Sequence, residues 1–320
     1  MPEMFLRRSV NAGHDGRTPV QNALQTLPIE PSETFYEPHF GLSTRPFQNV
    51  PDPNFLFLSS GHDEALSVMR YGLVTRAPVT MLTGEVGIGK TTLIRQILGE
   101  VPRQARVGLV SNLHDGRAHL LRWVLLALDE PVDRDADATD LVRQFQNMIV
   151  EAHAVGRRVI LIFDEAQKLG ADALESLRLL FDLTVDQGDV LQIVLVGQPE
   201  LRDLLDQPEL RQFAQRISAD YDLRSFRNTE THEYIRHRLH CAGADREIFS
   251  VEAMEKVHRT TGGVPRLINL LCEMALVYSF ADGSRTVEVS VLEDFLTNAR
   301  RLGTYRQFCT TVTAPRLVSA

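Results

Sequence analysis

The spacing of hydrophobic and polar positions changes along this chain of 320 residues, and each change predicts a different kind of structure. Between about residue 79 and residue 223, short apolar runs alternate with stretches in which apolar residues recur at helical spacing. The predicted strands share runs of apolar or β-branched residues and span 79–83, 106–110, 159–163, 190–196 and 217–223. Because strands and helices alternate and most of these runs are apolar throughout, we predict an α/β fold with a parallel sheet covered on both faces.

Helices are predicted wherever apolar residues recur every three or four positions. Within the α/β region these stretches cover 118–128, 139–155 and 173–181, and a helix capped by Ser59 or Ser60 precedes the first strand. After Arg227 the strand pattern stops, and helical stretches follow at 228–241, 250–262, 265–280 and from 290 onward. The pattern Ser290-x-x-Glu293 is typical of a capping box and predicts the start of the last helix.

These changes of pattern divide the sequence into four parts. Residues 1–34 mix Gly, Pro, Asn, Arg and Thr without sustained periodicity and are predicted to be a flexible N-terminal tail. Residues 35–227 are predicted to form the α/β domain, which begins with a segment rich in aromatic residues and proline. Residues 228–302 are predicted to form a small all-α domain, and residues 303–320 a C-terminal tail.

Charge and composition narrow the class of protein. The formal net charge of −8 and the pI near 5.7 argue against a surface that is a nucleic-acid platform throughout, although 34 Lys and Arg residues leave room for a local basic patch. Three widely spaced cysteines, Cys241, Cys272 and Cys309, resemble neither a disulfide framework nor a metal cluster, which favours a reducing cytoplasm. No run approaches the roughly 18 apolar residues of a spanning helix, so we expect a cytoplasmic protein with no direct membrane span.

The strongest chemical signal is a G-x-x-x-x-G-K-T motif between the first predicted strand and a helical stretch. Its residues share one predicted role, binding a polyphosphate, and are Gly84, Glu85, Val86, Gly87, Ile88, Gly89, Lys90, Thr91 and Thr92. Glycines let the backbone wrap a phosphate, whose charge the loop N–H groups and the helix N-terminus favour. Lys90 can reach the β- and γ-phosphates and the Thr91 hydroxyl can ligate Mg²⁺, so the motif predicts binding of a nucleoside triphosphate.

An acidic pair follows the third apolar run. Asp164 and Glu165 stand directly after Phe163, where ligands gather at the carboxyl ends of parallel strands. Asp164 can hold Mg²⁺ through its water shell, and Glu165 can orient and polarise the attacking water. Taken alone, such a pair can also be an acidic helix cap. Its position downstream of the phosphate motif favours the interpretation as the second half of an ATPase site.

Four further polar residues are candidates for the same site. Gln198 follows the strand at 190–196 and can lie near the γ-phosphate and the lytic water, or be a simple loop amide. Arg216, with Arg211 as the second choice, can act as a finger on a neighbouring subunit's phosphate, whereas in a monomer both would be solvated. Arg266, in the first turn of a helix where a cation opposes the helix dipole, is interpreted as a second nucleotide sensor.

One histidine has two possible interpretations on the sequence alone. His62 stands two positions after Ser60, the second of the predicted cap residues. It can touch the nucleotide, but a surface or capping histidine is at least as good an interpretation.

The motifs together resemble the AAA+ ATPases, and more closely those of the ExeA/GspA type. The similarity runs from about residue 40 to residue 302 through the segments FGLSTRPFQNVPDPNFLFLS, HDEAL, TGEVGIGKTT, LIFDEAQ, VGQPEL, LRQFAQRI and GGVPRLINLLC. It implies a sheet in the order 5-1-4-3-2, a helical lid, ATP with Mg²⁺ at subunit interfaces, and self-association on ATP binding. It also implies that the chain around Phe40 and around Tyr71-Gly72 frames the adenine.

The resemblance leaves two functions open. ExeA/GspA members of the secretion type usually continue into a membrane-spanning helix and a peptidoglycan-binding module, neither of which is recognisable in these 320 residues. Related ATPases of the TniB, TnsC and MuB group form helical filaments on duplex DNA and recruit a transposase. The first hypothesis is therefore an ATP-switched ring or filament that binds DNA and regulates transposition. The alternative is an ATPase that assembles or energises a secretion or envelope machine through protein contacts only.

Overall fold

The computed structural model describes residues 35–49, 52–102, 104–111, 120–184 and 189–308, which divide into two compact units. Residues 52–231 and 262–267 form the sheet unit, and residues 35–49, 232–261 and 268–308 form the helical unit. Helices α10 (Asn228–Cys241) and α12 (Pro265–Ala281) begin in the sheet unit and continue into the helical unit.

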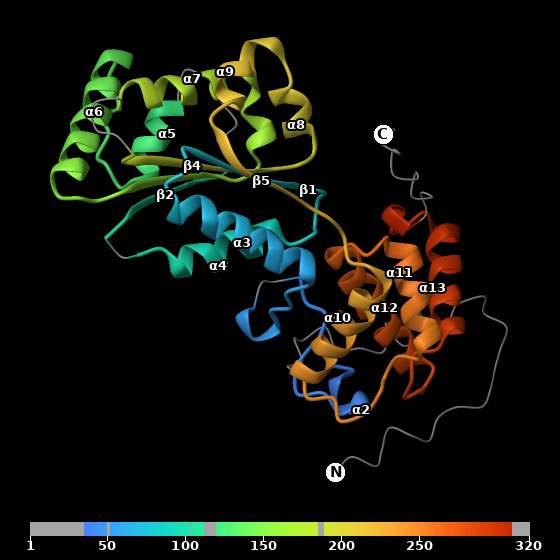
Figure 1. Cartoon of the computed structure of the whole chain (residues 1–320). Coiled ribbons are helices and arrows are strands. Elements are labelled where there is room, and N and C mark those ends of the chain that lie inside the picture. The colour runs from blue at the N-terminus through green and yellow to red at the C-terminus, as the bar shows by residue number, and fades with distance from the viewer. Residues whose placement is uncertain (1–34, 50–51, 103, 112–119, 185–188, 309–320) are drawn as a thin grey trace. The chain divides into compact units, whose positions relative to one another are not determined.

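The sheet unit is built on five parallel strands (Figure 1). They are β1 (Val79–Gly84), β2 (Arg106–Val110), β3 (Val159–Phe163), β4 (Leu191–Gly197) and β5 (Ile217–Leu223). Their order is β2-β3-β4-β1-β5, which confirms the predicted 5-1-4-3-2 arrangement and the α/β fold class. Since β1 lies between β4 and β5, and β4 between β3 and β1, the carboxyl ends of β1, β3 and β4 are neighbours along one edge.

Both faces of the sheet are covered, as the unbroken apolar runs predicted. Successive residues of β3 enter different cores, with Leu161 and Phe163 on one side and Ile160 and Ile162 on the other. Figure 1 shows α3 and α4 on one face and α5 to α9 on the other. These helices are α3 (Ser60–Val74), α4 (Lys90–Glu100), α5 (Leu120–Ala127), α6 (Ala138–Ala154), α7 (Gly170–Asp182), α8 (Glu200–Leu205) and α9 (Arg211–Ala214). Short 3₁₀ turns span Pro53–Phe55, Ala166–Lys168 and Pro208–Leu210.

The helical unit contains α2 (Glu37–Phe40), α11 (Val251–Thr261), α13 (Val289–Leu302) and most of α10 and α12. The predicted capping box at the start of α13 is wrong. The helix begins at Val289, its N-cap is Glu288, and no side-chain hydrogen bond caps it in the described structure. Ser290 therefore lies inside the first turn, where its hydroxyl is not in the capping position.

The aromatic and proline-rich segment packs differently from the predicted grouping with the sheet. Tyr36 donates a hydrogen bond of 2.6 Å to the Glu273 carboxylate, and Arg238 donates to the backbone carbonyls of Pro46 and Gln48. Residues 35–49 therefore belong to the helical unit, because their apolar rings cover helices that come much later in the chain.

The end of the chain also contributes to the helical unit. Residues 306–308 form a 3₁₀ turn, and Phe308 is buried with its ring edge to Phe295 of α13. The predicted N-terminal tail at 1–34 lies outside the described residues, as do residues 309–320 of the C-terminal tail predicted at 303–320 and the start of the predicted helix at 118. None of the described helices combines the length and apolar character required to cross a membrane.

Candidate active site

The carboxyl edge of the sheet gathers the predicted site residues of the sheet unit. The phosphate motif follows β1, Asp164 and Glu165 follow β3, and Gln198 follows β4. Register places Phe163 of β3 beside Leu195 of β4, and Gly197 of β4 beside Thr83 of β1. Three segments far apart in the sequence therefore end side by side, as expected for a ligand site in an open parallel sheet.

The phosphate loop depends on its glycines at two positions. Gly87 has φ of 82° and Gly89 has φ of 107°, a left-handed region that other L residues rarely adopt. A Cβ on Gly87 would lie 2.8 Å from Cβ of Arg266, and a Cβ on Gly89 would lie 2.8 Å from Nε2 of His62. The glycines thus serve two purposes, since they allow the turn and also let neighbouring chain approach the loop.

Lys90 is the first residue of α4 and is buried beneath the loop. Its Nζ donates hydrogen bonds to the carbonyl oxygens of Gly84 at 2.6 Å and Glu85 at 2.8 Å. Burial lowers the pKa of the Lys90 ammonium, while nearby carboxylates, Glu165 first, oppose that shift. The ammonium is therefore held inside the curve of the loop, on the side where a bound phosphate would need a cation.

Thr91 and Asp164 meet across the sheet edge. The Thr91 hydroxyl donates to Oδ2 of Asp164 at 3.1 Å, and the other carboxylate oxygen accepts from the backbone N–H of Glu165 at 2.9 Å. A hydroxyl oxygen beside a carboxylate is the ligand chemistry that Mg²⁺ prefers. The two side chains fit the predicted metal site, in which they would hold the ion that neutralises phosphate charge.

Glu165 has an unusual backbone and a well-defined carboxylate. Its φ of 57° and ψ of 38° place it in the left-handed region, a strain of roughly 1–2 kcal/mol that recurs at functional sites. Oε2 of Glu165 accepts hydrogen bonds from Nε2 of Gln167 at 2.9 Å and from Nε2 of Gln198 at 3.3 Å, and Nζ of Lys168 lies 3.4 Å away. Burial raises the pKa of Glu165, but these three donors outweigh it and lower the pKa below its usual value.

Gln167 was not predicted as a site residue. Its Oε1 accepts a hydrogen bond from the backbone N–H of Gln198 at 3.0 Å, while its Nε2 donates to Glu165. Gly197 makes room for it, since a Cβ there would lie 3.0 Å from Oε1 of Gln167. One amide therefore joins the candidate base to the candidate sensor. The sequence places Gln167 two positions after Glu165. The two side chains meet only because the chain turns sharply at Glu165.

The two arginines expected to act in trans come later in the chain than the residues of this cluster. Arg216, just before β5, places its guanidinium over the ring of Phe181 at 5.0 Å, and Nη2 lies 3.3 Å from Oδ1 of Asp182. Its side chain is about one-third exposed, at 35%. Arg211 is exposed at the start of α9. Both arginines are accessible at the surface, where a neighbouring molecule can reach them.

Arg266 and Phe40 fall in different units. Arg266 lies in the first turn of α12, as predicted, and its backbone N–H donates to the carbonyl of Gly87 at 3.2 Å. The turn before α12 is thus part of the wall of the phosphate loop. Phe40 lies in the helical unit, fully buried, with its ring edge to Tyr36 and His39. Its expected contact with adenine stays a prediction.

Comparison with known proteins places this geometry in context. A family described as "AAA domain" matches residues 74–205, the part of the chain from the end of α3 through α8. General secretion pathway protein A of Aeromonas hydrophila is 39% identical over 274 residues, which cover 85% of this chain and 50% of that protein. The chain therefore spans about half the length of that curated relative.

Solved structures share the fold at low sequence identity. The ORC2 protein of Aeropyrum pernix has a TM-score of 0.59 at 18% identity, covering 78% of this chain and 70% of that one. Cdc6p of Pyrobaculum aerophilum has a TM-score of 0.58 at 16% identity, with coverage of 74% and 68%. A Walker-type ATPase of Pyrococcus abyssi has a TM-score of 0.54 at 19% identity, with coverage of 80% and 77%. These similarities concern the fold alone.

Proposed function

We propose that this chain, an AAA-domain ATPase resembling general secretion pathway protein A, hydrolyses ATP to assemble or energise a secretion or envelope machine. ATP would bind at the carboxyl edge of the sheet, and the chain would self-associate so that each site lies at a subunit interface. The observation that carries the ATPase part is the convergence of Lys90, Glu165 and Gln198 on this edge.

Each side chain has a distinct task in this proposal. The loop N–H groups and Lys90 bind the phosphates, and Thr91 with Asp164 would hold Mg²⁺, which supplies charge neutralisation. Glu165 is ionised at neutral pH because its pKa is lowered, so its carboxylate can accept a hydrogen bond from the attacking water. Gln198 contacts the same carboxylate and can report the γ-phosphate to it. Gln167 restricts the orientation of both.

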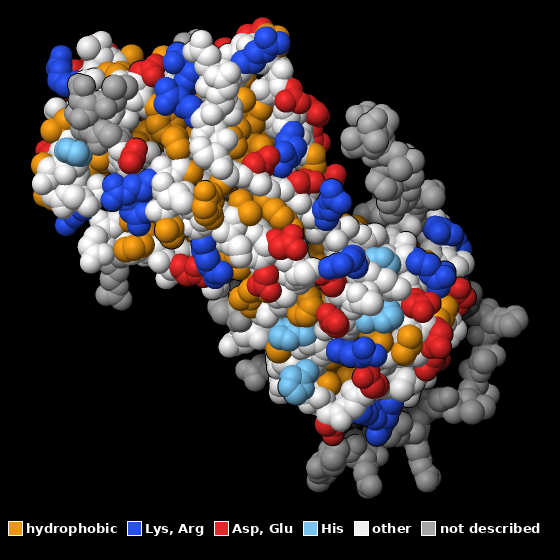
Figure 2. Space-filling view, viewed as in Figure 1, with side chains coloured by type: hydrophobic (Ala, Val, Ile, Leu, Met, Phe, Trp, Pro, Cys, Tyr) orange, Lys and Arg blue, Asp and Glu red, His pale blue; other side chains and the backbone are white. Residues whose placement is uncertain are grey.

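The choice of biological process rests on the curated relative. The name of that relative, general secretion pathway protein A, places it in the general secretion pathway, and 39% identity over 274 residues, 85% of this chain, favours the secretion hypothesis. The transposition hypothesis, preferred on sequence alone, finds no support in these comparisons. On the face seen in Figure 2 basic and acidic side chains are interspersed. We therefore take the alternative as the better proposal.

One experiment separates the two processes. ATP hydrolysis and sedimentation of the purified chain are measured with duplex DNA and, separately, with envelope membranes of the host, across a range of salt concentrations. We expect ATP-dependent sedimentation with the membranes and a hydrolysis rate that DNA leaves unchanged. DNA-stimulated hydrolysis that falls steeply with salt, without membrane association, would instead restore the transposition hypothesis.

Arg216→Ala tests whether the site is shared between subunits. We expect unchanged ATP binding but hydrolysis lower by about 10³-fold, because an arginine finger stabilises charge that develops only in the transition state. Mixing this variant with Lys90→Ala should restore part of the activity, since each supplies what the other lacks. The measurement is the steady-state ATPase rate as a function of the mixing ratio.

Arg178→Ala is the matched control for that experiment. Arg178 also pairs with Asp182, at 2.8 Å, so its removal disturbs the same carboxylate without removing the candidate finger. The control should hydrolyse ATP nearly as the parent does. Equal losses in both variants, or no complementation at any ratio, would rule out a trans-acting Arg216.

A further inference from the structure

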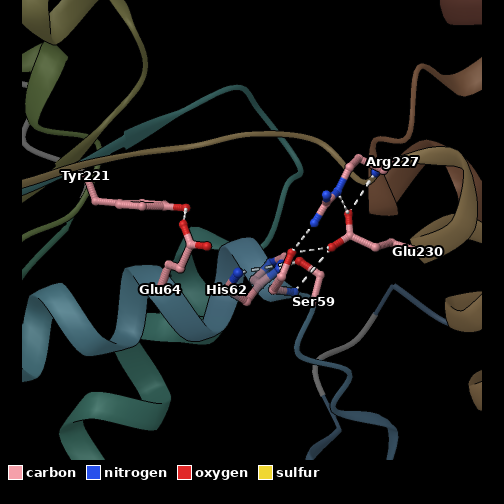
Figure 3. Close-up of polar contacts among 7 residues, drawn as sticks. Ser59, His62, Glu64, Tyr221, Arg227 and Glu230 are labelled. Carbon is pink, nitrogen blue, oxygen red and sulfur yellow. Dashed lines mark hydrogen bonds and ion pairs between the residues drawn. The ribbon is translucent and has the colours of Figure 1, made fainter.

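His62 lies directly behind the phosphate loop, in the first turn of α3. Its side chain is only 4% exposed, and both ring nitrogens have partners. Nε2 lies 2.9 Å from the carbonyl oxygen of Ile88, and Nδ1 lies 2.8 Å from Oγ of Ser59 (Figure 3). The histidine is therefore neither a surface group nor a free ligand, and it connects the loop to the start of a helix.

The partners determine the tautomer of the ring. A carbonyl oxygen only accepts, so Nε2 carries the proton and donates to Ile88, and Nδ1 accepts from the Ser59 hydroxyl. Ser59 Oγ in turn accepts from the backbone N–H of His62 and caps the helix. Burial lowers the pKa of His62, opposed by the Ile88 carbonyl and by the charges of Glu230 and Asp63. The neutral imidazole is thus fully hydrogen-bonded.

The bond to Ile88 is one of four that hold carbonyl oxygens of the loop. Lys90 holds the carbonyls of Gly84 and Glu85, the backbone N–H of Arg266 holds that of Gly87, and His62 holds that of Ile88. A loop that binds an anion with its N–H groups must turn its carbonyl oxygens away from the anion. His62 supplies one of these restraints, on the residue between the two left-handed glycines.

We propose that His62 is a positioning residue for the phosphate loop: by holding the Ile88 carbonyl away from the nucleotide, it preorganises the loop N–H groups for phosphate. The inference rests on the proposed binding of nucleotide at this loop. In this role His62 acts through the shape of the loop and needs no contact with the nucleotide.

The start of α3 is firmly held, which lets His62 serve as a fixed point. The Glu230 carboxylate accepts hydrogen bonds from the backbone N–H of Ser60 at 3.2 Å and from its hydroxyl at 2.8 Å. The same carboxylate accepts from the backbone N–H of Arg227 at 2.8 Å, and Arg227 Nη2 donates to the Ser60 hydroxyl at 2.6 Å. Figure 3 shows Arg227 and Glu230 at the N-terminal end of α3, beside the Ser59–His62 pair. Loop movement would therefore break the bond to Ile88 rather than carry the helix with it.

Two amide substitutions test the proposal because each keeps a different ring position. His62→Gln places an amide near the Nε2 position and can still donate to Ile88, whereas His62→Asn reaches only the Nδ1 position. We expect His62→Asn to bind ADP about tenfold more weakly, roughly 1.4 kcal/mol, and His62→Gln to stay within about threefold of the parent. The measurement is calorimetric titration with ADP, together with the kcat and KM of ATP hydrolysis.

Tyr221→Phe is the matched control. Tyr221 donates a hydrogen bond of 2.8 Å to Glu64, two residues after His62 on α3, and this bond involves neither His62 nor Ile88 (Figure 3). The loss of this bond should leave ADP affinity unchanged, whereas KM should rise in His62→Asn with kcat retained. Thermal unfolding without nucleotide accompanies each titration. Ser59→Ala, which removes both the partner of Nδ1 and the side-chain cap of α3, provides a second variant and should weaken ADP binding in the same direction.

The possible outcomes separate this inference from the proposed function. Parental affinity in both His62→Asn and Ser59→Ala would overturn the role of His62 while leaving nucleotide binding intact. Equal losses in His62→Gln and His62→Asn would also overturn it, because packing alone would then explain the effect. Absence of ADP binding by the parent chain would overturn the proposed function and, with it, the inference.

Discussion

Lys90→Ala is expected to lose ADP and ATP binding by at least about a hundredfold, roughly 3 kcal/mol. Lys90 provides the only ammonium inside the curve of the loop among the described residues, and it is already desolvated there by burial. In this variant a bound phosphate could still accept hydrogen bonds from the loop N–H groups, but no buried cation would lie beside it. The measurement is calorimetric titration with ADP, which separates binding from any later chemical step.

Folding must be checked in the same variant, because the carbonyls of Gly84 and Glu85 lose their donor. Lys90→Met keeps most of the side-chain volume and should lose nucleotide binding to the same extent. Lys168→Ala is the charge-matched control, since Lys168 lies near the same sheet edge but is half-exposed and contacts Glu165 rather than the loop. Affinity within threefold of the parent in Lys90→Ala would contradict the assignment of the loop as a phosphate site.

Glu165→Gln is expected to lower the rate of ATP hydrolysis by about 10²–10⁴-fold while ATP binding is retained. The amide can still accept hydrogen bonds from Gln167 and Gln198 through its oxygen, so the local geometry should persist. It cannot act as a base toward water. The variant should therefore accumulate the ATP-bound state, which single-turnover hydrolysis and sedimentation with ATP both report.

Glu209→Gln is the control for the charge change, because Glu209 is exposed in the 3₁₀ turn before α9. The pH dependence gives an independent check on the parent chain. Since the pKa of Glu165 is lowered from 4.5, its carboxylate is ionised above that pH, and kcat/KM should fall through this group only below about pH 4.5. Parental hydrolysis in Glu165→Gln would show that another group activates the water.

The fold was predictable because its signals are local and strong. Unbroken apolar runs such as 159–163 and 190–196 suit strands buried on both faces, and the helix from Asn228 to Cys241 has the bounds that its pattern predicts. The Ser290-x-x-Glu293 pattern is also a local signal, but the helix start that it predicts is wrong. A capping motif states a local preference, and the tertiary path of the chain placed the helix start at Val289 instead.

The candidate site was only partly predictable. Phosphate-loop residues, Asp164 and Glu165 follow strands directly, so their place at the carboxyl edge comes from the α/β pattern. Gln167 and His62 carry no such signal. Gln167 reaches both Glu165 and Gln198 only because Glu165 adopts a left-handed turn, and His62 meets Ile88 only because α3 packs beside the loop.

By itself, the sequence determined the class of fold, the order of elements and the segment that can hold a phosphate, because periodicity and the glycine-lysine motif act within a few residues of the chain. Tertiary structure alone decided which distant groups restrain that segment. Hydrogen bonds such as those of His62, Arg266 and Gln167 join residues from separate elements, and no local pattern encodes the approach of one element to another. The aromatic segment at 35–49 shows this most clearly, since its partners on α10 and α12 lie about two hundred residues away in the chain.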